Sequence, residues 1–296
     1  MRYGVTLPYI GVEATELVEL AVVAEAAGWD GVFVWDCVFI AHGANEGPEK
    51  MLTCDPWIAL AAMAARTQRV KLGTMVTPLS RRRPWKLARE TVTLDRLSGG
   101  RFILPVGLGA IDDGGFSKVG EELDRKVRAE LLDESLDILA GLWSGQPFSY
   151  TGKHYQVGEM TFLPTSAQTS HVPVWVVGAW PRMKSMRRTI RWDGVLPAKM
   201  TAEGASGDME PDDLRALGAY ITEQRPQVAG SDAASAFDIV MEGETPGDDG
   251  DRAAAIIRPL AEAGLTWWLE GVWQAPAAQG GLAGMRERIR QGPPRA

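Results

Sequence analysis

The chain has 296 residues, which is enough for one large α/β domain or two small ones. Apolar residues make up 45% and charged residues 23%, an ordinary globular composition with ample material for a core. The net charge of −7 argues against a nucleic-acid-binding or anionic-membrane surface, because both need an excess of basic side chains.

Two further features predict the compartment. Cys37 and Cys54 are too few and wrongly spaced for a zinc site or a redox pair, so we expect free thiols in a reducing cytoplasm. The N-terminus enters a strand at once and no signal peptide is recognised. No apolar run approaches the ~20 residues that a membrane-spanning helix needs. A cytoplasmic protein is expected.

Short apolar strands alternate with helical stretches along the whole chain. The predicted strands are 3–7, 31–35, 70–75, 101–106, 174–177, 194–196, 237–241 and 266–270. The predicted helices that follow them are 13–27, 56–67, 84–97, 125–143, 182–191, 212–224, 251–263 and 282–290. Asp55 with Pro56 is a good helix start, because the carboxylate caps the first turn and proline suits its first position. Eight strand–helix pairs predict a closed (β/α)8 TIM barrel formed by one domain over residues 1–296.

Two segments do not fit the barrel repeat. Residues 146–163 predict a hairpin with Thr151-Gly152 as its turn, the core of an insertion at about 146–172 that is either a lid or a packing element. Residues 36–53 form a long polar loop after the second strand, and long loops in compact domains are usually functional.

Small and polar residues follow the predicted strands, where ligands sit in parallel α/β folds. Thr74-Met75-Val76 ends the third strand before the Thr77-Pro78 turn, and Gly107-Leu108-Gly109 follows the fourth. Gly178-Ala179-Trp180 follows the fifth, and Arg182 opens the next helix, whose N-terminus is a potential anion site. No Ser-His-Asp triad, phosphate loop or Rossmann glycine pattern is recognised.

The stretch from Asp55 to Gly109 closely resembles the bacterial-luciferase-like monooxygenase family, whose members bind a flavin or deazaflavin at the mouth of a β/α barrel. The resemblance rests on an ordered series of motifs, namely Asp55-Pro56-Trp57, Val70 to Leu79, Arg81-Arg82-Arg83-Pro84, Leu94 to Arg101 and Gly107-Leu108-Gly109. It implies that the Thr74–Val76 segment carries a bulge, often with an unusual peptide conformation, that presses against the cofactor ring. It also implies that the cofactor phosphate faces the helix after Gly178, although Ala179 replaces the second glycine usual in the family. Leu7, at the end of the first strand, is a further cofactor-binding candidate.

The candidate catalytic residues are Asp36, His42 and Glu270. Asp36 ends the second strand, where related proteins often carry an acidic residue followed by histidine, but Cys37 takes the place of that histidine here. Glu270 ends the last strand beside two tryptophans and is either a reactive carboxylate or one bonded to backbone or to an arginine. The arginines of the 81–83 run either bind the cofactor's charged tail or have a structural role, in which they sit on the exterior or pair with acidic neighbours.

The resemblance implies an oxidoreductase acting on a small organic substrate, with two possible chemistries. With FMN, a separate flavin reductase supplies the reduced cofactor, which reacts with oxygen. With the deazaflavin coenzyme F420, a hydride moves between substrate and cofactor. We favour FMN slightly, and a homodimer is expected. The alternatives are a flavin-binding relative without turnover and a barrel lyase or isomerase without flavin. We also expect Gly178→Trp to abolish cofactor binding without disturbing the fold.

Overall fold

The computed structural model describes residues 1–7, 12–38, 54–111, 115–169, 171–201, 206–228, 236–271 and 281–294. Its strands are β1 (Arg2–Leu7), β2 (Gly31–Val34), β3 (Lys71–Thr74), β4 (Thr77–Pro78), β5 (Phe102–Gly107), β6 (Pro147–Thr151), β7 (Gln156–Thr161), β8 (Val174–Trp180), β9 (Gly194–Met200), β10 (Ser206–Gly207), β11 (Asp238–Gly243) and β12 (Trp267–Gly271). Its α-helices are α1 (Ala14–Ala26), α2 (Pro56–Arg66), α3 (Pro84–Leu97), α4 (Arg125–Trp143), α5 (Met183–Thr189), α6 (Pro211–Val228), α7 (Gly250–Glu262) and α8 (Gly281–Arg290). Short 3-10 turns, η2 (Leu79–Arg81) and η4 (Ser117–Val119), accompany them.

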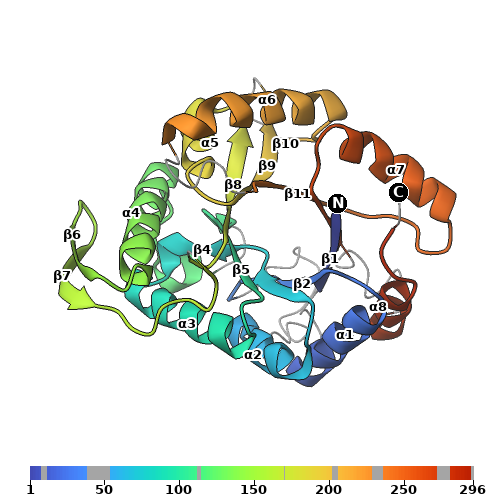
Figure 1. The fold of residues 1–296 in the computed structure, drawn as a ribbon, viewed down its shortest axis with the longest axis horizontal. Coiled ribbons are helices and arrows are strands. Elements are labelled where there is room, and N and C mark those ends of the chain that lie inside the picture. The colour runs from blue at the N-terminus through green and yellow to red at the C-terminus, as the bar shows by residue number, and fades with distance from the viewer. Residues whose placement is uncertain are drawn as a thin grey trace. The chain divides into compact units, whose positions relative to one another are not determined.

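Each of the eight main strands is followed in the chain by a helix, as the colour gradient of Figure 1 shows. The strands of this repeat are β1, β2, β3, β5, β8, β9, β11 and β12. This order is that of the (β/α)8 TIM barrel, so the predicted fold class is confirmed. None of the helices in the described part of the chain is long and apolar enough to cross a membrane.

The chain divides into two compact units, and the first comprises residues 1–7, 20–33 and 173–296. Within it β8, β9, β11, β12 and β1 pair in parallel in that order. An aromatic cluster packs its core: the rings of Trp175 and Trp267 lie 5.3 Å apart, and Phe33 stacks on Trp175 at 5.4 Å. All three side chains are fully buried. Aromatic pairs at such separations add to the free energy that burial alone provides.

The second unit comprises residues 8–19 and 34–172. In it β3 and β4 both pair in parallel with β5. Helix α2 begins as its sequence predicts, because the Asp55 carboxylate accepts hydrogen bonds from the amides of Trp57 and Ile58, both at 2.9 Å. Helices α3 and α4 have the bounds that their sequence pattern predicts.

The predicted hairpin is present as β6 and β7, but its turn differs from the expected Thr151-Gly152 pair. Thr151 pairs with Gln156, and the amide of Gly152 bonds the carbonyl of Tyr155, so a four-residue loop joins the strands. The Glu134 side chain of α4 explains the longer loop, because it accepts hydrogen bonds from three of its amides, at residues 153, 154 and 155. The hairpin lies beside α4 (Figure 1), which favours a packing role for the insertion.

Among the strands that run past their predicted ends, β8 and β9 extend furthest. β8 continues to Trp180 and β9 to Met200, where we expected ends at 177 and 196. Gly178 and Pro197 are the residues just beyond those predicted ends, yet they pair with each other in the parallel ladder. Tertiary pairing therefore overrides the weak strand preference of glycine and proline.

Candidate functional site

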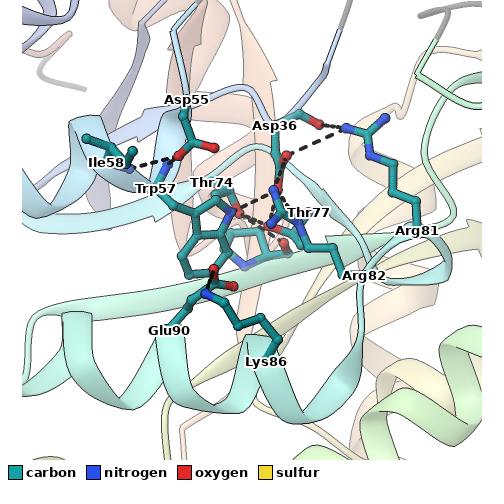
Figure 2. Close-up of polar contacts among 11 residues, drawn as sticks. Asp36, Asp55, Trp57, Ile58, Thr74, Thr77, Arg81, Arg82, Lys86 and Glu90 are labelled. Atoms are coloured by element: carbon teal, nitrogen blue, oxygen red, sulfur yellow. Dashed lines mark hydrogen bonds and ion pairs between the residues drawn. The ribbon is translucent and has the colours of Figure 1, made fainter. Parts of the chain in front are cut away.

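The Asp36 carboxylate is the centre of a buried hydrogen-bond network in the second unit (Figure 2). Its Oδ2 atom accepts hydrogen bonds from the Trp57 indole at 3.0 Å, the Thr77 hydroxyl at 3.0 Å and Arg82 Nε at 3.1 Å. Its Oδ1 atom accepts one from the other end of the Arg82 fork at 2.6 Å. Such charge-assisted pairing compensates a carboxylate for the water that it loses on burial.

Arg81 completes this network from the other side of Asp36 (Figure 2). It donates to the Asp36 main-chain carbonyl and lies 3.6 Å from Oδ1. Each guanidinium group also makes a cation–π contact. The central carbon of the Arg82 guanidinium lies 5.3 Å from the centre of the Trp57 ring, and that of Arg81 lies 5.2 Å from the centre of the Phe116 ring. Arg81 and Arg82 thus adopt the second of the two roles considered for the run, pairing with an acidic neighbour.

The turn between β3 and β4 has the unusual peptide conformation that the family resemblance implies. The Met75–Val76 peptide bond is cis. On either side of it the hydroxyls of Thr74 and Thr77 bond each other at 2.8 Å, and Thr77 also bonds Asp36. Met75 and Val76 themselves remain partly exposed. The Asp36 network therefore fixes both ends of a turn whose middle is accessible to a ligand.

The loop after β5 is held next to this turn. Pro78 of β4 pairs with Gly107, the last residue of β5. Gly109 has φ of 77°, a left-handed conformation that favours glycine, and a Cβ atom there would lie 2.7 Å from Pro78 Cβ. The buried Arg128 of α4 donates to the carbonyls of Leu108 and Gly109, both at 3.0 Å. Backbone conformation and a buried cation together fix this segment.

Arg128 and Phe116 were missed by the sequence reasoning. Arg128 also lies over Phe116, at 5.1 Å, so this fully buried ring contacts a guanidinium from α4 as well as that of Arg81. The spacing of Arg128, Leu132 and Ser135 along the buried face of α4 is the signal that could have identified the arginine.

In the first unit, Gly178, Ala179 and Trp180 belong to β8 itself. A Cβ atom on Gly178 would lie 2.9 Å from Thr189 and 3.0 Å from Val195, so the added side chain would enter the packing around β8. We therefore now expect Gly178→Trp to disturb the fold, which replaces the expectation that the variant keeps it. The Ala179 amide donates to Ser185 at 3.0 Å.

Arg182 is exposed just before the seven-residue helix α5, and its side chain makes no capping bond there. Leu7, at the end of β1, is fully buried. Neither placement tests the cofactor-binding role predicted for these residues.

Glu270 is 2% exposed in β12 and is fully engaged within the first unit. It accepts hydrogen bonds from the amide and hydroxyl of Thr245, both at 2.7 Å, and from the Trp268 indole at 3.0 Å. The Nη2 atom of Arg288 lies 3.3 Å from the Oε2 atom of Glu270. This is the second of the two interpretations considered for Glu270, a carboxylate bonded to backbone and to an arginine. Burial, and then the charge of Glu270, raise the pKa of the neighbouring Glu244.

The candidates thus fall into separate groups. Within the second unit the structure brings together Asp36, Thr74, the Met75–Val76 turn and the Gly107–Gly109 loop. Within the first unit, β1 with Leu7 pairs with β12, which carries Glu270, and Gly178 to Trp180 pair with β9. His42 lies outside the described residues.

Comparison with known proteins identifies the class to which this barrel belongs. The model of the family described as luciferase-like monooxygenase matches residues 1–244. The chain belongs to this family, which places it among the luciferase-like oxidoreductases.

Several curated relatives carry the name F420-dependent glucose-6-phosphate dehydrogenase. The one from Nakamurella multipartita is 34% identical over 170 residues, covering 56% of this chain and 47% of the relative. The one from Amycolatopsis mediterranei is 36% identical over 172 residues, covering 56% and 48%. The chain spans about half the length of the curated relatives it matches.

Solved structures with the same fold include proteins described with either cofactor. An F420-dependent secondary alcohol dehydrogenase in complex with an F420–acetone adduct has a TM-score of 0.75 at 19% identity and covers 98% of both chains. The oxygenating constituent of 3,6-diketocamphane monooxygenase from Pseudomonas putida, in complex with FMN, has a TM-score of 0.68 at 17% identity, covering 100% of this chain and 98% of the other. At these identities the similarity shows the fold alone.

Proposed function

We propose that this chain is an oxidoreductase that transfers a hydride between a small organic substrate and the deazaflavin coenzyme F420. The observation that carries the proposal is the sequence similarity, at 34% and 36% identity, to two relatives named as F420-dependent dehydrogenases. This reverses the slight preference for FMN drawn from the sequence. The fold does not distinguish the cofactors, because structures of similar fold are described with F420 and with FMN.

The second unit offers features that suit a planar redox ring. The partly exposed Met75–Val76 turn provides a surface for the ring, and the Gly107–Gly109 loop allows close backbone approach. Bound there, the coenzyme would supply the hydride chemistry, while the protein supplies orientation and exclusion of water. A turn held from both sides is preorganised, so it need not reorder when the ring binds.

We assign Asp36 a positioning role within this proposal. Its carboxylate oxygens accept bonds from Trp57, Thr77 and Arg82, and it holds the turn through Thr77. Cys37, next in the chain, is partly buried and replaces the histidine often found in related proteins.

FMN-dependent oxygenation is the second candidate, because the family carries the monooxygenase name. It would require a separate flavin reductase as a partner, whereas F420-linked hydride transfer needs none. A homodimer remains our proposal for either chemistry, and the molar mass in solution measured by light scattering tests it. Flavin binding without turnover is the third candidate.

Titration of the purified chain with F420 and, separately, with FMN tests the proposal, with tryptophan fluorescence as the signal. We expect F420 to bind at least about tenfold more tightly than FMN, a difference of about 1.4 kcal/mol. Thr77→Val should weaken F420 binding, because it removes the hydroxyl that ties the turn to Asp36. Thr93→Val is the matched control, since Thr93 is exposed on α3 and bonds only the Arg89 carbonyl.

Each result has a distinct meaning. Tighter binding of FMN would replace the proposal by the monooxygenase. Binding of neither cofactor would refute both. F420 binding without any change in the cofactor's visible absorbance across alcohols, aldehydes and sugar phosphates would favour the flavin-binding protein without turnover.

A further inference from the structure

A cavity of about 230 Å³ lies within the second unit, and the Asp36 network forms part of its wall. Its lining includes residues 80–83, which run from η2 to the residue before α3, and residues 121–122. His154 and Tyr155 of the hairpin loop, with Leu131 of α4, complete the lining. The cavity is smaller than the roughly 300–1,000 Å³ of pockets for drug-sized ligands, so it suits a small molecule and not a flavin.

A buried hydroxyl in the wall lacks a hydrogen-bond partner. Ser80 is 6% exposed, and its Oγ atom bonds nothing among the described residues. Leaving such a group unsatisfied is unfavourable, and native proteins usually satisfy it with protein, water or a ligand. Ser80 is one of the residues that line the cavity, but its Oγ atom has almost no accessible surface, so the hydroxyl contacts a bound molecule only after the side chain rotates about χ1.

Two charged side chains of the wall are also unengaged. The Arg83 guanidinium and the Glu121 carboxylate make no hydrogen bond or ion pair within the described ranges. Most of the remaining lining groups are already bonded: Arg82 binds Asp36, and the His154 ring bonds Glu130 at 2.9 Å. Among the described residues of its lining, the cavity therefore offers three groups without a hydrogen-bond or ion-pair partner: the Ser80 hydroxyl, the Arg83 guanidinium and the Glu121 carboxylate.

We propose that this cavity binds a small carboxylate that carries a hydrogen-bond donor next to its acid group, as an α-amino acid or an α-hydroxy acid does. The planar Arg83 guanidinium would donate two parallel hydrogen bonds to the carboxylate of the ligand. The Ser80 hydroxyl, once rotated, would donate a third. Glu121 accepts from the ammonium or hydroxyl group. A plain dianion is disfavoured, because Glu121 and Glu122 both line the cavity.

Isothermal titration calorimetry of the full chain, without any redox cofactor, tests the proposal. The probes are serine and lactate, with acetate, ethylamine and inorganic phosphate for comparison. We expect serine or lactate to bind at least about tenfold more tightly than acetate or ethylamine. Whether serine or lactate binds more tightly identifies the donor as ammonium or hydroxyl.

Three variants assign the binding to this cavity. Ser80→Ala, Arg83→Ala and Glu121→Gln should each weaken binding by about tenfold. Arg125→Ala is the matched control, because Arg125 is exposed at the start of α4 and does not line the cavity. Ser80 Oγ makes no hydrogen bond among the described residues, so Ser80→Ala should not lower the melting temperature of the free chain.

The proposal is overturned if neither serine nor lactate binds at 10 mM, if acetate or phosphate binds as tightly, or if Arg83→Ala binds as well as the unmodified chain. These outcomes are independent of which redox cofactor the chain uses.

Discussion

Replacing Asp36 by asparagine should destabilise the chain strongly, because it leaves two arginines without their counter-charge. The side chain of Asp36 is 3% exposed, that of Arg81 4% and that of Arg82 21%. Removing one partner of a buried ion pair typically costs about 3–5 kcal/mol. We expect the lower end, about 3 kcal/mol, since water reaches part of Arg82.

The corresponding fall in melting temperature is about 6–12 °C, taking about 2–4 °C per kcal/mol for a chain of this size. Thermal unfolding followed by circular dichroism measures it. Asp212→Asn is the control: Asp212 also pairs with an arginine, Arg215, but its side chain is 94% exposed, so the change should be below about 2 °C. If Asp36→Asn melts within about 2 °C of the unmodified chain, the network does not have the role assigned to it here.

Three other substitutions should each lower the stability of the chain. Gly109→Ala should destabilise by about 2 kcal/mol or more, because φ is 77° and the new Cβ would lie 2.7 Å from that of Pro78. Arg128→Met should cost about 2–3 kcal/mol through the lost bonds to the carbonyls of Leu108 and Gly109, and should weaken cofactor binding, as thermal unfolding and fluorescence titration would show. Hydrogen bonds from two hairpin side chains lower the pKa of Glu130 to about 2 from 4.5, so its stabilising effect is present above pH 4.5 and is lost as pH falls towards 2. Glu130→Gln should therefore lower the melting temperature at pH 6 and have no effect near pH 2.

Matched substitutions separate these effects from general damage. Gly218→Ala on α6 should stabilise the chain, since nothing lies within 4 Å of the added Cβ. Arg125→Met, on the same helix as Arg128 but exposed, should leave the melting temperature unchanged. Glu159→Gln in β7, which changes an exposed carboxylate of the same hairpin, should leave the melting temperature at pH 6 unchanged. A loss of stability in any of these controls would contradict the local explanations.

The local signals in the sequence predicted the elements well where side chains of the same segment decide the conformation. Helix α2 starts at its aspartate cap and proline, and α3 and α4 follow their apolar spacing from end to end. Strand ends were less predictable. Gly178 and Pro197 are poor strand residues by themselves, and only their pairing across β8 and β9 keeps them in the sheet.

The sequence indicated where the candidate site around Asp36 and the Met75–Val76 turn lies, but not which side chains form hydrogen bonds in it. The family motif indicated the unusual peptide at residues 75–76, and the cis bond is present. The partners of Asp36 lie 21 to 46 residues further along the chain, a relation that no local pattern carries. Arg128 resembles its exposed neighbours in sequence, and only its position on the buried face of α4 distinguishes it.

The placement of the tryptophans has a practical consequence for spectroscopy. Trp175 and Trp267 lie close enough for their indole transitions to couple, so they should dominate the near-ultraviolet circular dichroism of the first unit. Trp57, packed against Phe102 at 5.5 Å, is an optical reporter within the second unit. Comparing the near-ultraviolet signal with the fluorescence lost in Trp57→Phe would show whether both units melt in a single cooperative transition or one after the other.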